Sequence, residues 1–170
     1  NKISYNLSHI KYENNEFKEA LKYVDKAIAN KKNDEKAHLL KGNILKNLEN
    51  LKESILSTRT AIEINPELEE GHQNLSLSLR EINQLEEAEF HARKAIKLNK
   101  NCYESYLSLS SILRLQMKIP EAISAIRKSM ELNPNNPTSH YNLAHLLLKS
   151  KKFKEGWMEY EWRWQRKNIN

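Results

Sequence analysis

The sequence predicts an all-α protein built from five helix-turn-helix repeats of 34 residues. The chain has 170 residues, which is five times 34. Three Gly, four Pro and very few Val or Thr leave it without the turn residues and most of the β-formers of an all-β protein. Small and apolar residues also recur every 34 positions, a period typical of stacked helical repeats.

Small residues mark three positions of close helix packing in each repeat. The five repeats are 1–34, 35–68, 69–102, 103–136 and 137–170. Repeat position 8 holds Ser8, Gly42, Ser76, Ser110 and Ala144, and position 20 holds Ala20, Ser54, Ala88, Ala122 and Gly156. Position 27 holds Ala27, Ala61, Ala95 and Ser129, before Arg163 breaks the column. Because small residues let two backbones approach closely, each repeat is predicted to be a packed helix pair.

Large apolar residues fill other columns at the spacing of a buried helical stripe. Position 17 holds Phe17, Leu51, Leu85, Ile119 and Phe153, and position 28 holds Ile28, Ile62, Ile96, Met130 and Trp164. These columns predict a core that continues from one repeat to the next.

Polar residues predict where the helices begin and end. The pairs Asn14-Asn15 and Asn83-Gln84 separate the first helix of a repeat (helix A) from the second (helix B). Pro120 suits the first turn of a helix, where no N–H is needed. A left-handed stop after helix B is predicted at Asn65, Asn99 and Asn133.

A 34-residue helix pair with small residues at positions 8, 20 and 27 and Pro at position 32 resembles the tetratricopeptide repeat (TPR). The resemblance covers the whole chain and implies a right-handed α-solenoid in which helix A lines a concave groove. Position 4 is usually a large aromatic residue in the family. Here it is Ser4, His38, His72, Tyr106 and His140.

Composition limits the class of protein further. The chain has a net charge of +6 and no apolar run near the ~18 residues that span a bilayer, so we expect it to fold in water. Cys102 has no partner for an internal disulfide, which favours a cytoplasmic location. Because the chain begins with Asn1 rather than Met, we also expect it to be part of a longer protein.

The residues predict no catalytic, cofactor or metal site. Three of the six His share position 4, which favours a packing role. His140 and His145 lie five apart, which is wrong for the i, i+4 pair of a zinc helix. Phosphate-cradling glycines are absent as well. We therefore expect no enzymatic activity in this chain.

The predicted groove carries two columns of candidate binding residues. Position 6 holds Asn6, Asn74 and Asn142, whose amides suit the backbone of an extended peptide, although Leu40 and Ser108 interrupt the column. Position 12 adds the cations Lys46, Arg80 and Arg114. The alternative is that these amides serve helix packing and the cations are a solvated face.

The Asn column is similar to the Asn ladder that lines the TPR superhelix of O-linked N-acetylglucosamine transferases and holds substrate backbones there. The rival TPR mode, a carboxylate clamp for chaperone C-termini, needs Lys, Asn or Arg at positions 5 and 9 of successive repeats. Only Asn43 meets that requirement, so we reject the clamp and keep Asn43 as a groove residue.

The last repeat departs from the pattern by placing all three Trp within eight residues. Phe153, Trp157, Tyr160 and Trp164 share one face of a continued helix, and this face is predicted to cover the fourth repeat. Trp162 points elsewhere and has no predicted partner within the array. We therefore expect Trp157, Trp162 and Trp164 to form a docking surface for following chain or for a second copy.

Residues 153–164 also resemble the Phe-x-x-Gly-Trp-x-x-Tyr-Glu-x-Arg-Trp signature that ends TPR arrays in bacterial multidomain proteins. A glycosyltransferase-like domain commonly follows there. The resemblance implies an alternative to a free-standing scaffold: the substrate-recruiting part of a glycosyltransferase, whose catalytic domain lies outside this chain.

The expected partner is a protein or peptide segment held in the concave groove. A C-terminal domain of the same parent chain and self-association through the C-terminal end are further expectations. Residues 149–170 are basic and rich in Trp. The Glu residues among these cations argue against nucleic acid. No membrane partner is predicted.

Overall fold

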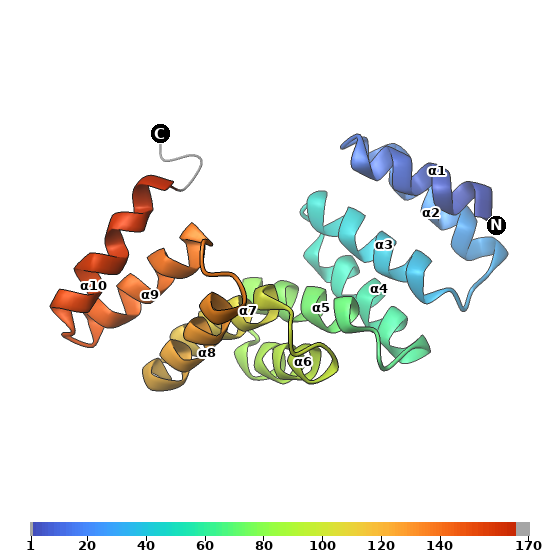
Figure 1. Ribbon diagram of the computed structural model, residues 1–170. Helices are drawn as coiled ribbons and strands as arrows, with labels where there is room; N and C mark the ends of the chain where they lie inside the picture. The colour runs from blue at the N-terminus through green and yellow to red at the C-terminus, as the bar shows by residue number, and fades with distance from the viewer. Residues whose placement is uncertain (1, 166–170) are drawn as a thin grey trace. The chain divides into compact units, whose positions relative to one another are not determined.

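The computed structural model describes residues 2–165 and shows ten α-helices that alternate as helix A and helix B (Figure 1). The A helices are α1 (Lys2–Glu13), α3 (Glu35–Asn47), α5 (Glu69–Glu81), α7 (Tyr103–Leu115) and α9 (Pro137–Lys149). The B helices are α2 (Phe17–Asn30), α4 (Leu51–Ile64), α6 (Leu85–Leu98), α8 (Ile119–Leu132) and α10 (Phe153–Tyr160). Every B helix begins at repeat position 17, which confirms the 34-residue period and the all-α fold.

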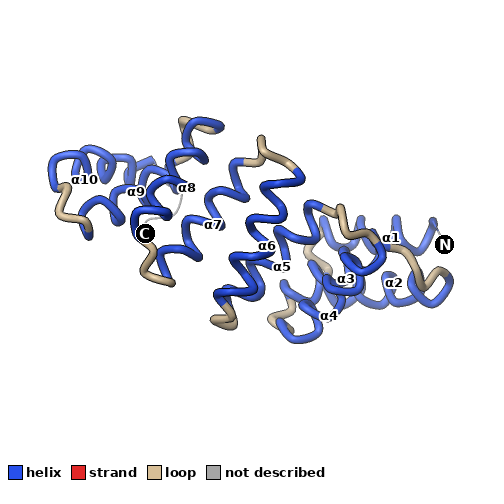
Figure 2. The backbone as a smooth tube through the Cα atoms, turned by 90° about the horizontal axis from the view of Figure 1, so that it is seen from below, coloured by secondary structure: helices blue, strands red, loops and turns tan. Residues whose placement is uncertain are grey.

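The chain forms two compact units, residues 1–84 and 85–170. In the N-terminal unit α1 packs on α2, α3 on α2 and α4, and α5 on α4. In the C-terminal unit α7 packs on α6 and α8, and α9 on α8 and α10. Figure 2 shows the two helices of each such pair running side by side. The division into one array of five repeats stays a prediction.

The small residues at positions 8 and 20 meet where helix A crosses helix B. Ser8 Oγ donates to the Ala20 carbonyl at 2.8 Å, and Ser110 Oγ donates to the carbonyl of residue 122 at the same distance. In the second repeat the roles are exchanged, because Ser54 Oγ donates to the Gly42 carbonyl at 2.8 Å. A Cβ atom on Gly42 would collide with the Thr58 hydroxyl. The prediction of close helix packing at these columns is confirmed.

The turn between helix A and helix B has a left-handed residue at position 15 of every repeat. These residues, with φ near 60°, are Asn15, Glu49, Asn83, Met117 and Lys151. Asn tolerates this conformation better than other non-Gly residues. The other three residues, Glu49, Met117 and Lys151, adopt this strained conformation because the turn requires it.

The predicted left-handed stop after helix B is wrong. Asn65 and Asn133 have φ values of −133° and −139°, and Asn99 is also not among the residues with positive φ. Instead, the side-chain oxygen of Asn65 accepts from the Glu67 N–H at 3.1 Å, and Asn99 does the same for the N–H two residues on. Asn65 and Asn99 therefore stabilise the turn between repeats through Asx turns.

The histidines at position 4 tie α3, α5 and α9 to the turns that precede them. The Nε2 atoms of His38, His72 and His140 lie 2.8, 3.1 and 2.6 Å from the carbonyl oxygens six residues earlier. A carbonyl only accepts, so each Nε2 donates. This recurring bond explains the histidine column as a packing feature.

The C-terminal end differs from the predicted continuous helix. Helix α10 ends at Tyr160 and a 3-10 turn, η1 (Glu161–Gln165), follows. The tighter turn changes the register, so Trp162 stacks on the His140 ring with centroids 3.8 Å apart and planes 3° apart. The expectation that Trp162 has no partner in the array is therefore wrong. Trp157 and Trp164 are 56% and 71% exposed, so the predicted covering face lies largely in solvent.

Among the described residues, no helix is both long and apolar enough to cross a bilayer.

Candidate functional site: the face of the A helices

Two adjoining cavities follow the A helices of the N-terminal unit. One, of about 360 Å³, is lined by residues of α1 and α3 and by the start of α5. The other, of about 490 Å³, continues over α3 and α5. Tyr12, Asn43 and Glu70 line both cavities, which together form a groove along α1, α3 and α5.

Asn43 and Asn74 form an amide pair on the wall of the larger cavity. Asn74 Nδ2 donates to Asn43 Oδ1 at 2.8 Å, which links α5 to α3. This bond uses one of the donors of Asn74 and one lone pair of Asn43. The Nδ2 protons of Asn43 and the Oδ1 atom of Asn74 keep their hydrogen-bonding capacity, the combination that a peptide backbone requires.

Asn6 is not brought together with this pair. It is exposed on α1 and lines neither of the two cavities. The structure therefore groups Asn43, which the sequence singled out only through the rejected clamp, with Asn74 rather than extending a ladder from Asn6.

Lys46 lies in the groove but is neutralised there. Its Nζ atom is 3.3 Å from Glu81 Oε1, and both side chains line the larger cavity. Arg80, in the last turn of α5, is half-buried and is not among the residues that line this cavity. Of the two cations predicted for this unit, Lys46 is therefore the one shown paired with an acidic group.

Nearby carboxylates also affect the pKa of a tyrosine that lines the smaller cavity. Burial raises the pKa of the Tyr5 hydroxyl, and the nearby charges of Asp34 and Glu70 raise it further. Tyr5 thus stays a neutral donor and acceptor on the cavity wall.

The C-terminal unit has a cavity of about 500 Å³ on the corresponding A-helix face. Arg114 approaches it from α7, and Asn142 from α9. Tyr141, His145 and Lys149 of α9 also line it, and repeat counting missed them because they fall outside the position-6 and position-12 columns. Apolar side chains of α9, Leu146 and Leu148, complete the lining.

The cations at this cavity are not neutralised by the described part of the chain. Within residues 2–165, no carboxylate lies within ion-pair distance of Arg114 or Lys149. Lys149 Nζ instead contacts the Met117 sulfur at 3.2 Å, a weak acceptor. No acidic residue lines the cavity.

Aromatic rings close one side of the same cavity. Tyr141 and His145 meet edge to face with centroids 4.5 Å apart, and both lie within 6 Å of the Tyr160 ring. Trp157 packs edge to face on Tyr160 at 5.6 Å. Two of the predicted docking tryptophans thus have distinct surroundings: Trp157 belongs to this cluster, whereas Trp162 stacks on His140.

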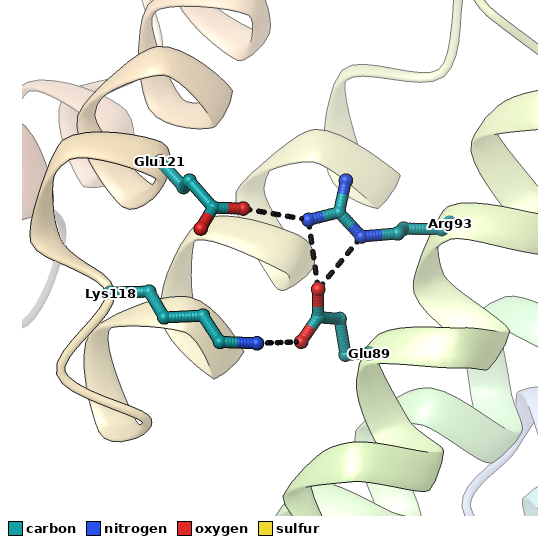
Figure 3. A network of polar contacts seen from close by, with 4 residues as sticks. All are labelled: Glu89, Arg93, Lys118 and Glu121. Carbon is teal, nitrogen blue, oxygen red and sulfur yellow. Dashed lines mark hydrogen bonds and ion pairs between the residues drawn. The ribbon is translucent and has the colours of Figure 1, made fainter.

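The B-helix face of the C-terminal unit holds several of its cations in ion pairs. Glu89 of α6 accepts from Arg93 at 2.8 Å and from Lys118 at 2.7 Å, and Arg93 also reaches Glu121 of α8 at 3.0 Å (Figure 3). Burial alone would raise the pKa of the Glu89 carboxyl, but the hydrogen bonds from Lys118 and Arg93 outweigh it and lower the pKa. This network joins α6 to α8 and is structural.

In the described residues, no three His, Cys, Asp or Glu side chains meet in a way that would hold a metal ion. The arrangement on the A-helix face offers amides, cations and aromatic rings, which are groups for binding.

Family models match most of the chain in separate pieces. Residues 2–34 and 35–68 each match the tetratricopeptide repeat model. Residues 81–162 match the model described as anaphase-promoting complex, cyclosome, subunit 3. No curated protein sequence matches the chain significantly.

Solved structures share the fold at low sequence identity. MamA (residues 41 to the end) from Desulfovibrio magneticus RS-1 superposes with a TM-score of 0.89 and 18% identity, over 98% of this chain and 97% of that one. PilF of Pseudomonas aeruginosa superposes with a TM-score of 0.90 and 19% identity, over 99% of this chain and 77% of that one. YrrB is described as a TPR protein with an unusual peptide-binding site. It superposes with a TM-score of 0.79 and 21% identity, over 94% of this chain and 82% of that one. None of these matches is a glycosyltransferase.

Proposed function

We propose that this chain, a tetratricopeptide-repeat protein, is a scaffold that binds an extended segment of a partner protein along its A-helix face. The observation that carries the proposal is the Asn43–Asn74 amide pair on the wall of a groove. Side-chain amides that keep a donor and an acceptor can pair with a peptide backbone without selecting its side chains. The peptide-binding site named for YrrB, a protein of the same fold, supports this reading.

Each predicted groove residue has a role in this proposal. Asn43 and Asn74 contact the ligand backbone in the N-terminal unit, and Asn142 does so in the C-terminal unit. Asn6 makes a peripheral contact from α1. Acidic side chains of the ligand are contacted by the cations Arg80 and Arg114, whereas Lys46 makes such a contact only when its pair with Glu81 opens.

The test uses peptides selected from a phage-displayed library of random 12-residue sequences on the full chain. We expect Asn43→Ala combined with Asn74→Ala to weaken selected peptides about five-fold, as the loss of one or two neutral hydrogen bonds implies. Asn30→Ala, on a B helix, is the matched control and should change nothing. Unchanged affinity of the double variant, with circular dichroism showing a folded protein, would contradict the backbone contact.

The glycosyltransferase alternative has no support in the comparisons, so the scaffold function is proposed alone. A cytoplasmic location and a C-terminal partner domain stay predictions. Self-association through the C-terminal end also stays a prediction. Light scattering over a range of protein concentrations tests it, with Trp157→Ala as the variant that should reduce the mass.

A further inference from the structure

We propose that the cavity between α7 and α9 selects the ligand of this protein, and that it takes an acidic peptide segment rich in Glu or Asp. This inference rests on the proposed function, because it assigns a ligand chemistry to one part of the same A-helix face.

The donors around the cavity converge from two helices. Asn142, His145 and Lys149 follow one strip of α9 at the i, i+3, i+7 spacing of a single helix face. Arg114 faces them from the last turn of α7. A guanidinium fork, an ammonium group and an amide therefore surround one space, and this set of donors matches carboxylate oxygens.

The apolar part of the lining fits the stem of an acidic side chain. Leu146 is fully buried and Leu148 partly so, and both border the cavity. The methylene groups of a glutamate can pack on them while its carboxylate reaches the cations. A volume of about 500 Å³ accommodates a few side chains of a peptide rather than a whole folded surface.

Among residues 2–165, no acidic side chain lines this cavity. In α7 and α9 the only carboxylate is Glu104, in the first turn of α7, whereas Arg114 lies in the last turn. The two carboxylates of α10 engage other partners: Glu155 pairs with Arg127 and Glu159 contacts His140. The cations of the cavity therefore keep their charge available for a ligand.

A helix-end effect does not explain this arrangement by itself. Cations stabilise the last turn of a helix through the macrodipole, and Lys11, Lys46 and Lys97 also occupy last turns. Lys11 and Lys46 are each paired with a glutamate. What sets the α7–α9 cavity apart is that Arg114 and Lys149, from two different helices, line one space.

The geometry favours a peptide over nucleic acid. Binding of a single strand requires a continuous basic track and free ring faces for stacking. Here two cations flank one cavity, and the rings of Tyr141 and His145 already pack on each other and on Tyr160.

The experiment measures binding of fluorescein-labelled hexaglutamate to the full chain by fluorescence anisotropy at low salt. Arg114→Glu combined with Lys149→Glu should weaken binding about ten-fold or more, since two charge-assisted contacts are lost. Lys97→Glu combined with Lys100→Glu is the matched control, because it changes the net charge equally and also alters a helix end. The milder pair R114Q/K149Q guards against a variant that fails to fold.

Retained binding by R114Q/K149Q overturns the inference, as does an equal loss with the control pair. Tighter binding of a ten-residue thymidine oligonucleotide that depends on Arg114 and Lys149 overturns it in favour of nucleic acid. If library-selected peptides are not acidic and bind R114E/K149E as tightly as the unchanged chain, this inference fails and the proposed function stands. If the selected peptides bind the Asn43 and Asn74 variants as tightly as the unchanged chain, the proposed contact of these two residues with the peptide backbone is wrong as well.

Discussion

The two compact units carry the same buried columns but different surface charges. Residues 1–84 contain 13 Lys or Arg and 13 Asp or Glu, whereas residues 85–170 contain 15 and nine, so the whole net charge of +6 belongs to the C-terminal unit. In the N-terminal unit the cation Lys46 of the groove is paired with Glu81. In the C-terminal unit the paired cations lie on the B helices, and Arg114 and Lys149 of the A helices face a cavity without acidic residues.

This difference shows that helix packing fixes some positions of each repeat and leaves the charges of the A-helix surface free to differ. Columns 8 and 20 are fixed by helix packing and hold only Ser, Gly or Ala in both units. The A-helix surface is free of that constraint, so neighbouring repeats of one fold can present different chemistry.

The largest expected effect tests whether the two scaffolds are equivalent. Ile44 and Leu146 both occupy repeat position 10, and their exposed fractions are 0% and 1%. Replacing either by Ala should lower the stability of its own unit by about 3 kcal/mol, because both leave a cavity in a close-packed core. Native-state hydrogen exchange should show the loss in α3 and α4 for Ile44→Ala and in α9 and α10 for Leu146→Ala. A strongly unequal cost would break the equivalence.

A smaller effect is expected from the aromatic stack that only the last repeat has. His38 and His140 both bond the preceding turn, but Trp162 covers only His140. Trp162→Ala should destabilise the C-terminal unit by about 2 kcal/mol through lost burial and ring stacking. Trp157→Ala removes a side chain that is 56% exposed and should cost less than about 1 kcal/mol. Urea unfolding followed by circular dichroism compares the two; equal costs would show that the stack contributes nothing specific.

The turn at repeat position 15 predicts a still smaller and opposite pair of effects. Asn15 and Lys151 both have φ near 60°, a conformation that costs most L-residues about 1 kcal/mol and Asn less. Lys151→Asn should therefore stabilise the C-terminal unit by up to about 1 kcal/mol, and Asn15→Lys should destabilise the N-terminal unit by a similar amount. Thermal unfolding of both variants measures the difference. Shifts of the same sign would contradict the strain argument.

The sequence predicted the scaffold because burial leaves little choice at its columns. A residue such as Ala20 or Ser110 must be small where two backbones meet, and this requirement repeats every 34 residues. Features that occur in only one repeat could not be predicted from the 34-residue period. The change from α-helix to 3-10 turn after Tyr160, which brings Trp162 onto His140, leaves no periodic signal.

The candidate site was predictable only in part, for a related reason. Repeat counting found Asn74, Lys46 and Arg114 because they share columns with other polar residues. It did not find that Lys46 is paired with Glu81, since whether a cation is neutralised depends on contacts between neighbouring A helices. Lys149 was missed because it lies one position beyond the column of Arg114.

The smallest expected effect tests whether the ion pair of Lys46 causes the difference in available positive charge between the N-terminal groove and the α7–α9 cavity. The Lys46–Glu81 distance of 3.3 Å joins two partly exposed side chains, so breaking the pair should alter stability by less than about 0.5 kcal/mol. In a chain that carries R114E/K149E, Glu81→Gln should release the Lys46 charge into the N-terminal groove and raise hexaglutamate affinity about three-fold. Glu63→Gln, on a B helix, makes the same change in net charge and should have no effect. If Glu81→Gln matches this control, pairing of the cation does not distinguish the units, and the shape of the α7–α9 cavity must account for any selectivity.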